Sequence, residues 1–165
     1  MSLAEPTAPL ATAPWRRGLV RAARTGRQVG GGAAVSAPPQ WCPCRPPQQR
    51  VAYPDCCGRY HRGAQHGAAP TPELLMRSRY SAFVLGEWDY LRQTWHPSTR
   101  PAAVDSAAAG LRWLGLEVRG QAHTDADHAT VEFVARSKLA GRAHRLHETS
   151  RFIRVEGRWY YVDAQ

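Results

Sequence analysis

No segment of this chain is apolar over the roughly 18 residues that a membrane-spanning helix needs. The N-terminus also lacks the continuous apolar stretch of a secretory signal, although five arginines lie within residues 16–27. Patterns typical of a phosphate-binding loop, a nucleophile elbow or a dinucleotide site are missing too. These absences predict a cytoplasmic protein without a membrane segment, and they leave no standard motif from which to assign a reaction.

Acidic residues are scarce in the first part of the chain, and this accounts for most of the net charge of +9. Residues 1–69 contain nine arginines and two acids, whereas residues 70–165 contain 13 basic and 11 acidic residues. A nucleic-acid-binding domain carries its basic patch on the folded surface. Because the second part is nearly neutral, we do not expect nucleic acid to be the partner. Binding through the Arg-rich residues 1–40 is the alternative.

Composition divides the chain into three segments. Residues 1–40 are rich in Ala, Pro, Gly and Arg and show no hydrophobic period, which predicts a disordered tail. A targeting peptide is one alternative, and a true start near Val35, with residues 1–34 not translated, is another. Residues 41–69 hold all four cysteines in a loop-rich unit, and residues 70–165 are the predicted main domain.

The main domain opens with the signals of a helix start. Thr71 suits the N-cap, Pro72 suits the first helical position, and Glu73 places a negative charge in the first turn. Apolar residues then follow at helical spacing until Gly86. The pattern predicts one helix from Pro72 to about this glycine.

A second helical segment follows. Trp88, Leu91 and Trp95 form one apolar stripe, and His96-Pro97 predicts its end. The Ala-rich residues 102–109 predict a short third helix.

From residue 111 onward the apolar period changes to two, which predicts strands. Leu114, Leu116 and Val118 alternate with other residues, and residues 130–136 do the same. The last stretch predicts a hairpin that turns at Glu156-Gly157. Helices followed by antiparallel strands indicate an α+β fold, with a helical hairpin laid on a curved sheet. The predicted cross-strand pairs are Phe152–Tyr161, Ser150–Asp163 and Arg154–Trp159.

The four cysteines, Cys42, Cys44, Cys56 and Cys57, lie close together in sequence, with His61 shortly after them. Cytoplasmic thiols stay reduced, which favours metal ligation over disulfides, and zinc suits four thiolates. A unit this short has almost no core, so a metal would supply its folding energy. The spacing is tighter than in a usual zinc knuckle. Two alternatives therefore stay open, namely a reduced loop without metal and a site that uses two cysteines and His61.

Three motifs resemble the YchJ-like family. They read CPC…YPDCCGRYH, APTPELLMRSRYSAFVLGEWDYLRQTWHPSTRP and HETSRFIRVEGRWYYVDAQ, and the resemblance covers residues 41–165. It implies a SEC-C zinc motif joined to a nuclear transport factor 2-like domain, a cone of N-terminal helices packed on a curved antiparallel sheet. In the family pattern, C-P-C-G-S-G-x-x-Y-x-x-C-C, the zinc ligands fall on all four cysteines of this chain. Here, however, residues 45–50 replace Gly-Ser-Gly, and three residues are inserted between the cysteine pairs.

The resemblance also implies two kinds of binding. A SEC-C motif forms the tail of the bacterial preprotein translocase motor, where it engages a partner chaperone, so the motif here could dock another protein by analogy. Domains of this fold bind ligands between the helices and the concave face of the sheet, so we expect a pocket for a small ligand. Together these features predict a zinc-binding adapter or binding module.

An enzyme is the alternative function, specifically a small-molecule isomerase, dehydratase or hydrolase. In the predicted register Glu148 and Tyr161 share a face with large aromatic residues, a setting typical of a carboxyl group that transfers protons. His96 is a candidate second titratable partner. The competing interpretation is structural, with Glu148 paired to Arg79 or Arg151.

Overall fold

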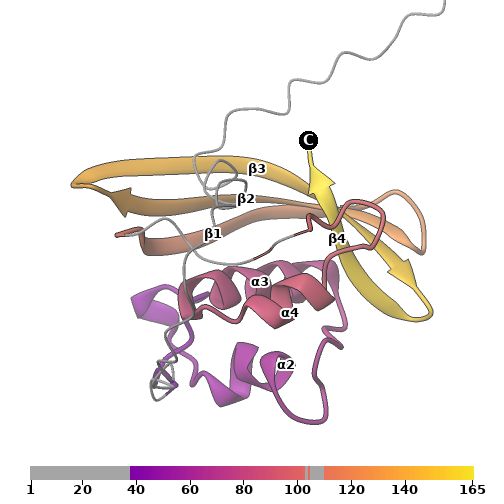
Figure 1. The fold of residues 1–165 in the computed structure, drawn as a ribbon, viewed down its shortest axis with the longest axis horizontal. Coiled ribbons are helices and arrows are strands. Elements are labelled where there is room, and N and C mark those ends of the chain that lie inside the picture. Colours follow the sequence, from indigo (N-terminus) through magenta and orange to yellow (C-terminus); the bar gives the residue numbers. More distant parts are fainter. Residues whose placement is uncertain (1–37, 103, 105–109) are drawn as a thin grey trace, which may run out of the picture.

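The computed structural model describes residues 38–102, 104 and 110–165. These residues form a sheet, a layer of two helices against one face of the sheet, and a small cysteine-bearing unit on the far side of the helices (Figure 1). Residues 1–37 of the predicted tail and most of the predicted third helix lie outside the described residues. The elements in chain order are η1 (Pro47–Gln49), η2 (Pro54–Gly58), α2 (Arg59–His61), α3 (Pro72–Leu85), α4 (Trp88–Gln93), β1 (Arg112–His123), β2 (His128–Leu139), β3 (Arg142–Val155) and β4 (Arg158–Ala164).

Helix α3 begins and ends where the sequence predicts. The hydroxyl of Thr71 accepts a hydrogen bond from the backbone N–H of Leu74 at 3.2 Å, which satisfies one of the free donors of the first turn. Gly86 ends the helix in the left-handed conformation, with φ of 74°. Glycine adopts this conformation without the steric cost that a Cβ atom imposes.

Helix α4 ends at Gln93, earlier than the predicted end at His96-Pro97. The cause is a pair of backbone hydrogen bonds to the last strand. The N–H of Tyr161 donates to Thr94 O at 2.9 Å, and the N–H of His96 donates to Tyr161 O at 2.7 Å. These bonds hold Trp95 beside the edge of the sheet, so its backbone leaves the helix.

The sheet is an antiparallel meander in the order β1-β2-β3-β4. The predicted turn at Glu156-Gly157 is confirmed, with φ of 50° and 78°, and Ala140-Gly141 makes a second turn with φ of 48° and 82°. Positive φ at both central residues is the type I′ geometry, whose twist matches that of the flanking strands.

β-bulges shift the register at three places in the sheet, and two of them contradict the sequence predictions. Phe152–Tyr161 and Arg154–Trp159 pair as predicted, but Ser150–Asp163 was wrong. A shift between Arg151 and Phe152 places Arg151 opposite Asp163, and their side chains form an ion pair at 2.6 Å.

The second bulge lies in β1, between Trp113 and Gly115. It turns Trp113 toward α3, where its ring lies 5.5 Å from that of Tyr80, and it leaves Leu114 54% exposed. Leu114 therefore does not belong to the apolar face that the alternation predicted, because a bulge reverses which residues face the core.

Helix α3 contacts β1, β2 and β4 on one side and the cysteine unit on the other. Leu75 of α3, Leu91 of α4 and Val131 of β2 are fully buried. No helix of the described residues combines the length and the apolar character needed to cross a membrane.

We expect Thr71→Ala to lower the free energy of unfolding by about 1 kcal/mol, since it removes the cap of α3. Denaturant unfolding followed by circular dichroism measures this. Thr71→Ser keeps the hydroxyl and should restore most of the loss. Equal stability of Thr71→Ala and the wild type would show that this cap does not stabilise α3.

Candidate functional site

The four cysteine sulfur atoms gather at one point inside the cysteine unit. Cys44 Sγ lies 3.5 Å from Cys42 Sγ and 3.6 Å from both Cys56 Sγ and Cys57 Sγ. All four atoms lie within 4.8 Å of one another, and all four residues are buried. Four sulfur atoms around a tetrahedral zinc ion, at about 2.3 Å from it, lie about 3.8 Å apart. The cluster therefore has the dimensions of a site that could hold a metal ion.

The segment between the two cysteine pairs forms a closed loop. Cys42 N–H donates to Val51 O at 2.9 Å, and Trp41 and Ala52 form an antiparallel bridge. Within the loop, η1 makes one exposed turn with no buried residue. Residues 46–50 thus lie at the surface, and Cys44 belongs to the cluster.

A distorted helical turn brings the two adjacent cysteines to the same point. In η2, Cys56 has the non-helical angles φ −118° and ψ −106°, and this kink aims its side chain and that of Cys57 inward. The turn packs tightly, because a Cβ atom on Gly58 would lie 2.8 Å from Tyr53 O. Glycine is required at this close backbone approach.

The four thiols lie so close together that they shift the pKa values of one another. The pKa of Cys42 is lowered by the neighbouring thiols, that of Cys44 first. The pKa of Cys57 is raised by its contacts with Cys42, Cys44 and Cys56 and by burial. Four thiolates at these distances repel one another unless a cation lies among them. Ser81 of α3 adds a hydroxyl 3.5 Å from Cys42 Sγ. The main domain thus contacts the cluster directly.

His61, the alternative ligand, contacts other groups. Its Nε2 donates to Ser78 O of α3 at 2.8 Å, and its Nδ1 accepts from the hydroxyl of Tyr53 at 2.7 Å. Burial lowers the pKa of His61. The neutral ring therefore joins the cysteine unit to α3.

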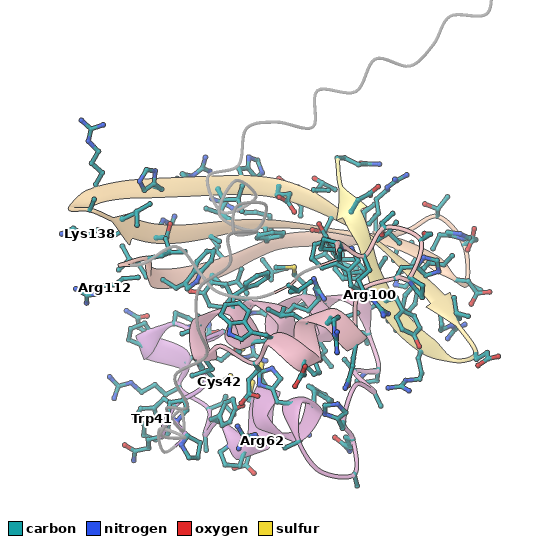
Figure 2. The ribbon with its side chains drawn as sticks, in the orientation of Figure 1. Trp41, Cys42, Arg62, Arg100, Arg112 and Lys138 are labelled. Carbon is teal, nitrogen blue, oxygen red and sulfur yellow. The ribbon has the colours of Figure 1, made fainter. Side chains whose placement is uncertain are left out.

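In Figure 2, Cys42 lies closer to the helices than Trp41 does.

A second candidate site is a pocket between α3 and the sheet that is partly open to solvent. Three polar residues, Arg79, Glu148 and Ser150, lie in its wall together with Tyr161. The remaining wall is apolar or aromatic, and its residues are Met76, Tyr80, Phe83, Trp95, Trp113, Phe133, Ala135 and Leu146.

Arg79 is the central charged residue of this pocket. Its Nη1 donates to Leu91 O and to Thr94 Oγ1, each at 2.8 Å, and its guanidinium lies 4.4 Å from the ring centre of Tyr161. Burial lowers the pKa of Arg79 to about 10, against the opposing effects of Tyr161, Tyr90 and Glu148. The side chain is therefore still charged at neutral pH.

The structure brings Glu148 and Tyr161 together but not His96. Glu148 is 8% exposed, and its Oε1 accepts a hydrogen bond from the hydroxyl of Ser150 at 3.0 Å. The ring of His96 lies against Tyr160 and bonds to the hydroxyl of Ser98 at 2.7 Å. Tyr160 is next to Tyr161 in β4 and points to the opposite face of the sheet, so His96 does not line the pocket.

From the sequence, Arg79 was expected only as a structural ion-pair partner of Glu148, and Ser81 was not identified as a site residue. The available signal was position, because Arg79 falls on the apolar stripe of α3 between Leu75 and Ala82. A charged residue on a buried stripe needs partners inside the fold. No local pattern marks Ser81, whose contact is with a cysteine 39 positions away.

Comparison with known proteins identifies the family. Residues 71–164 match the model of the middle, NTF2-like domain of YchJ. The chain belongs to the YchJ family. A UPF0225 protein of Bordetella pertussis is 60% identical over 126 residues, covering 76% of this chain and 92% of that protein. A UPF0225 protein of Methylibium petroleiphilum is 60% identical over 124 residues, covering 75% and 87%.

Two solved structures share the fold. A SEC-C motif containing protein from Rhodopseudomonas palustris is 33% identical, with a TM-score of 0.65 over 75% of this chain and 96% of that one. A second, from Psychrobacter arcticus, is 34% identical, with a TM-score of 0.65 over 75% and 81%. The expected fold is confirmed. It is an α+β, NTF2-like domain with a four-stranded antiparallel sheet, preceded by a cysteine cluster.

The buried His61 should make the folded state sensitive to acid. Because its pKa in the folded state lies below the ordinary 6.5, the unfolded chain binds the proton more readily. The stabilising contribution is complete above about pH 6.5 and is lost as the pH falls through the lower folded-state pKa.

We expect His61→Gln, which keeps one donor and one acceptor, to lose less stability than the wild type between about pH 7 and pH 5. Denaturant unfolding at each pH measures this difference. Protonation of the cysteines is common to both proteins, so it cancels in the comparison. Parallel pH profiles would contradict a neutral, buried His61.

Proposed function

We propose that this protein is a zinc-stabilised binding module, in which a SEC-C-like knuckle is joined to a domain that binds a small ligand in its pocket. The observation that carries the proposal is the cluster of four buried sulfur atoms at tetrahedral spacing, described above. In the proposal Cys42, Cys44, Cys56 and Cys57 hold the ion, and His61 does not. None of the four cysteines forms a disulfide, which accords with a cytoplasmic protein.

The proposed metal is structural. Four protein ligands close the coordination shell of zinc, whereas a catalytic zinc keeps a position open for water or substrate. Burial of all four cysteines supports the same conclusion. Bound zinc would supply charge neutralisation and most of the folding energy of the unit. The residues of the chain do the rest, since Ser81 and His61 fix the unit on α3.

The knuckle could also dock a protein partner. Trp41, 42% exposed, lies on its surface, and the guanidinium of Arg50 stacks over it at 5.7 Å. Tryptophan and arginine are enriched where protein surfaces recognise one another. This supports the adapter role that the SEC-C likeness suggests.

Protein purified without chelator should contain about one zinc per chain with protected thiols. Cys44→Ser should reduce the zinc content to less than about a tenth and destabilise the unit, since Cys44 contacts all three other sulfur atoms. Ser81→Ala is the matched control, because it changes a neighbour and removes no ligand. Metal analysis by mass spectrometry and a thiol count measure both effects. No zinc and four reactive thiols in the wild type would refute the metal site.

A second candidate function is supported by one observation, namely that Glu148 and Tyr161 line the same pocket. A carboxylate beside a phenol is a pair that can move a proton at a bound carbonyl compound, as an isomerase or dehydratase does. His96 has no part in this candidate, because its ring lies outside the pocket.

The enzyme candidate makes its own prediction. If Glu148 is a base, the protein should accelerate hydrogen–deuterium exchange at the α-carbon of a carbonyl probe, 2-indanone, in D₂O. Removing a general base costs roughly 100-fold or more, so Glu148→Gln should abolish the acceleration. Proton NMR measures the exchange. No acceleration by the wild type leaves the binding module as the function.

A further inference from the structure

The pocket between α3 and the sheet has a polar end and an apolar end. Leu146, Glu148 and Ser150 follow one another along the inner face of β3, so they mark positions along its length. Near Leu146, the rings of Phe83 and Trp113 lie 6.2 Å apart and form an aromatic wall. Near Ser150 the wall is polar. A ligand that fills the pocket therefore has an apolar body and a polar head.

The charges at the polar end cancel. Arg79 is 3% exposed and Glu148 is 8% exposed, so each side chain is buried. Both side chains line the same pocket, so groups of opposite formal charge share its wall. A charged ligand would lose its hydration on entry and would meet a wall with no net charge to compensate. The polar end therefore favours an uncharged head group that can hydrogen-bond.

Two hydrogen-bond donors in the pocket wall have no partner. The indole Nε1 atoms of Trp95 and Trp113 are buried and make no hydrogen bond. Trp95 as a whole is only 6% exposed. A buried N–H without an acceptor is unfavourable, and a carbonyl oxygen is a good acceptor for it. Glu148 of β3 lines the same pocket, and its carboxylate is an acceptor that suits an N–H group of a ligand.

We propose that the pocket binds a small, uncharged aromatic molecule with an amide-like head group. The N–H of the head group donates a hydrogen bond to Glu148, and its carbonyl oxygen accepts one from the indole N–H of Trp95 or Trp113. The aromatic body lies between Phe83, Trp113 and Leu146. This inference rests on the ligand-binding role proposed above and names the chemical class of the ligand.

Three probes that share one phenyl ring test the head group, namely benzamide, benzoate and benzylamine. Protein with ¹⁵N-labelled tryptophan reports binding through the indole N–H resonances, which Trp95→Phe and Trp113→Phe assign. Benzamide should shift the resonances of Trp95 and Trp113. It should also bind at least about fivefold more tightly than either charged probe, a difference of one good hydrogen bond.

Glu148→Gln should weaken benzamide binding about fivefold, because the carboxylate is the stronger acceptor. The matched control is Glu132→Gln on the outer face of the sheet, where the carboxylate pairs with His147 at 2.6 Å. This variant should bind benzamide as the wild type does. Zinc content is measured on the same samples, so that loss of the knuckle is not mistaken for loss of the pocket.

The outcomes separate the two proposals. Tighter binding of benzoate or benzylamine would overturn the uncharged head group but leave the ligand-binding role standing. Benzamide binding that Glu148→Gln does not change would overturn the assigned hydrogen bond. If none of the probes moves either indole resonance, both the ligand class and the ligand-binding role fall.

Discussion

Helix α3 is buried on two sides, and the rest of the structure depends on this constraint. One side packs on the sheet, and the other packs on the cysteine unit. Ser78 and Ser81, both completely buried, face the unit, and their small side chains let it approach closely. Ser78 contributes its carbonyl to His61, and Ser81 contributes its hydroxyl to Cys42. The cysteine cluster and the domain are therefore parts of one packed structure.

The same helix links the cluster to the pocket. Arg79 follows Ser78 in α3 but points to the other side, into the pocket wall. Its hydrogen bonds to Leu91 O and Thr94 Oγ1 hold the end of α4, and its guanidinium stacks on Tyr161 of β4. The buried guanidinium of Arg79 thus donates hydrogen bonds to the C-terminal end of α4 and contacts the last strand, β4. Burying the charged guanidinium is unfavourable unless all these contacts form together. The shape of the pocket therefore depends on how α3 and α4 pack.

The residues between the two cysteine pairs form an exposed loop. Its ends are joined by the bridge between Trp41 and Ala52. Surface loops accept insertions at little cost because closure entropy grows slowly with length. The inner geometry depends instead on the kinked turn at Cys56 and on the glycine after Cys57, where no side chain would fit.

Local chemistry in the sequence alone determined the start of α3 at Thr71, its end at Gly86 and the hairpin turn at Glu156-Gly157. Each depends on residues a few positions apart. For the cysteines, the sequence left more than one arrangement open, and the tertiary structure brought all four together. Only the tertiary structure decided the end of α4, the two bulges that moved Leu114 and Asp163, the engagement of His61 with α3, and the exclusion of His96 from the pocket. Those outcomes depend on hydrogen bonds and packing between distant segments, whose combined free energy outweighs a local preference and leaves no mark in a short stretch of sequence.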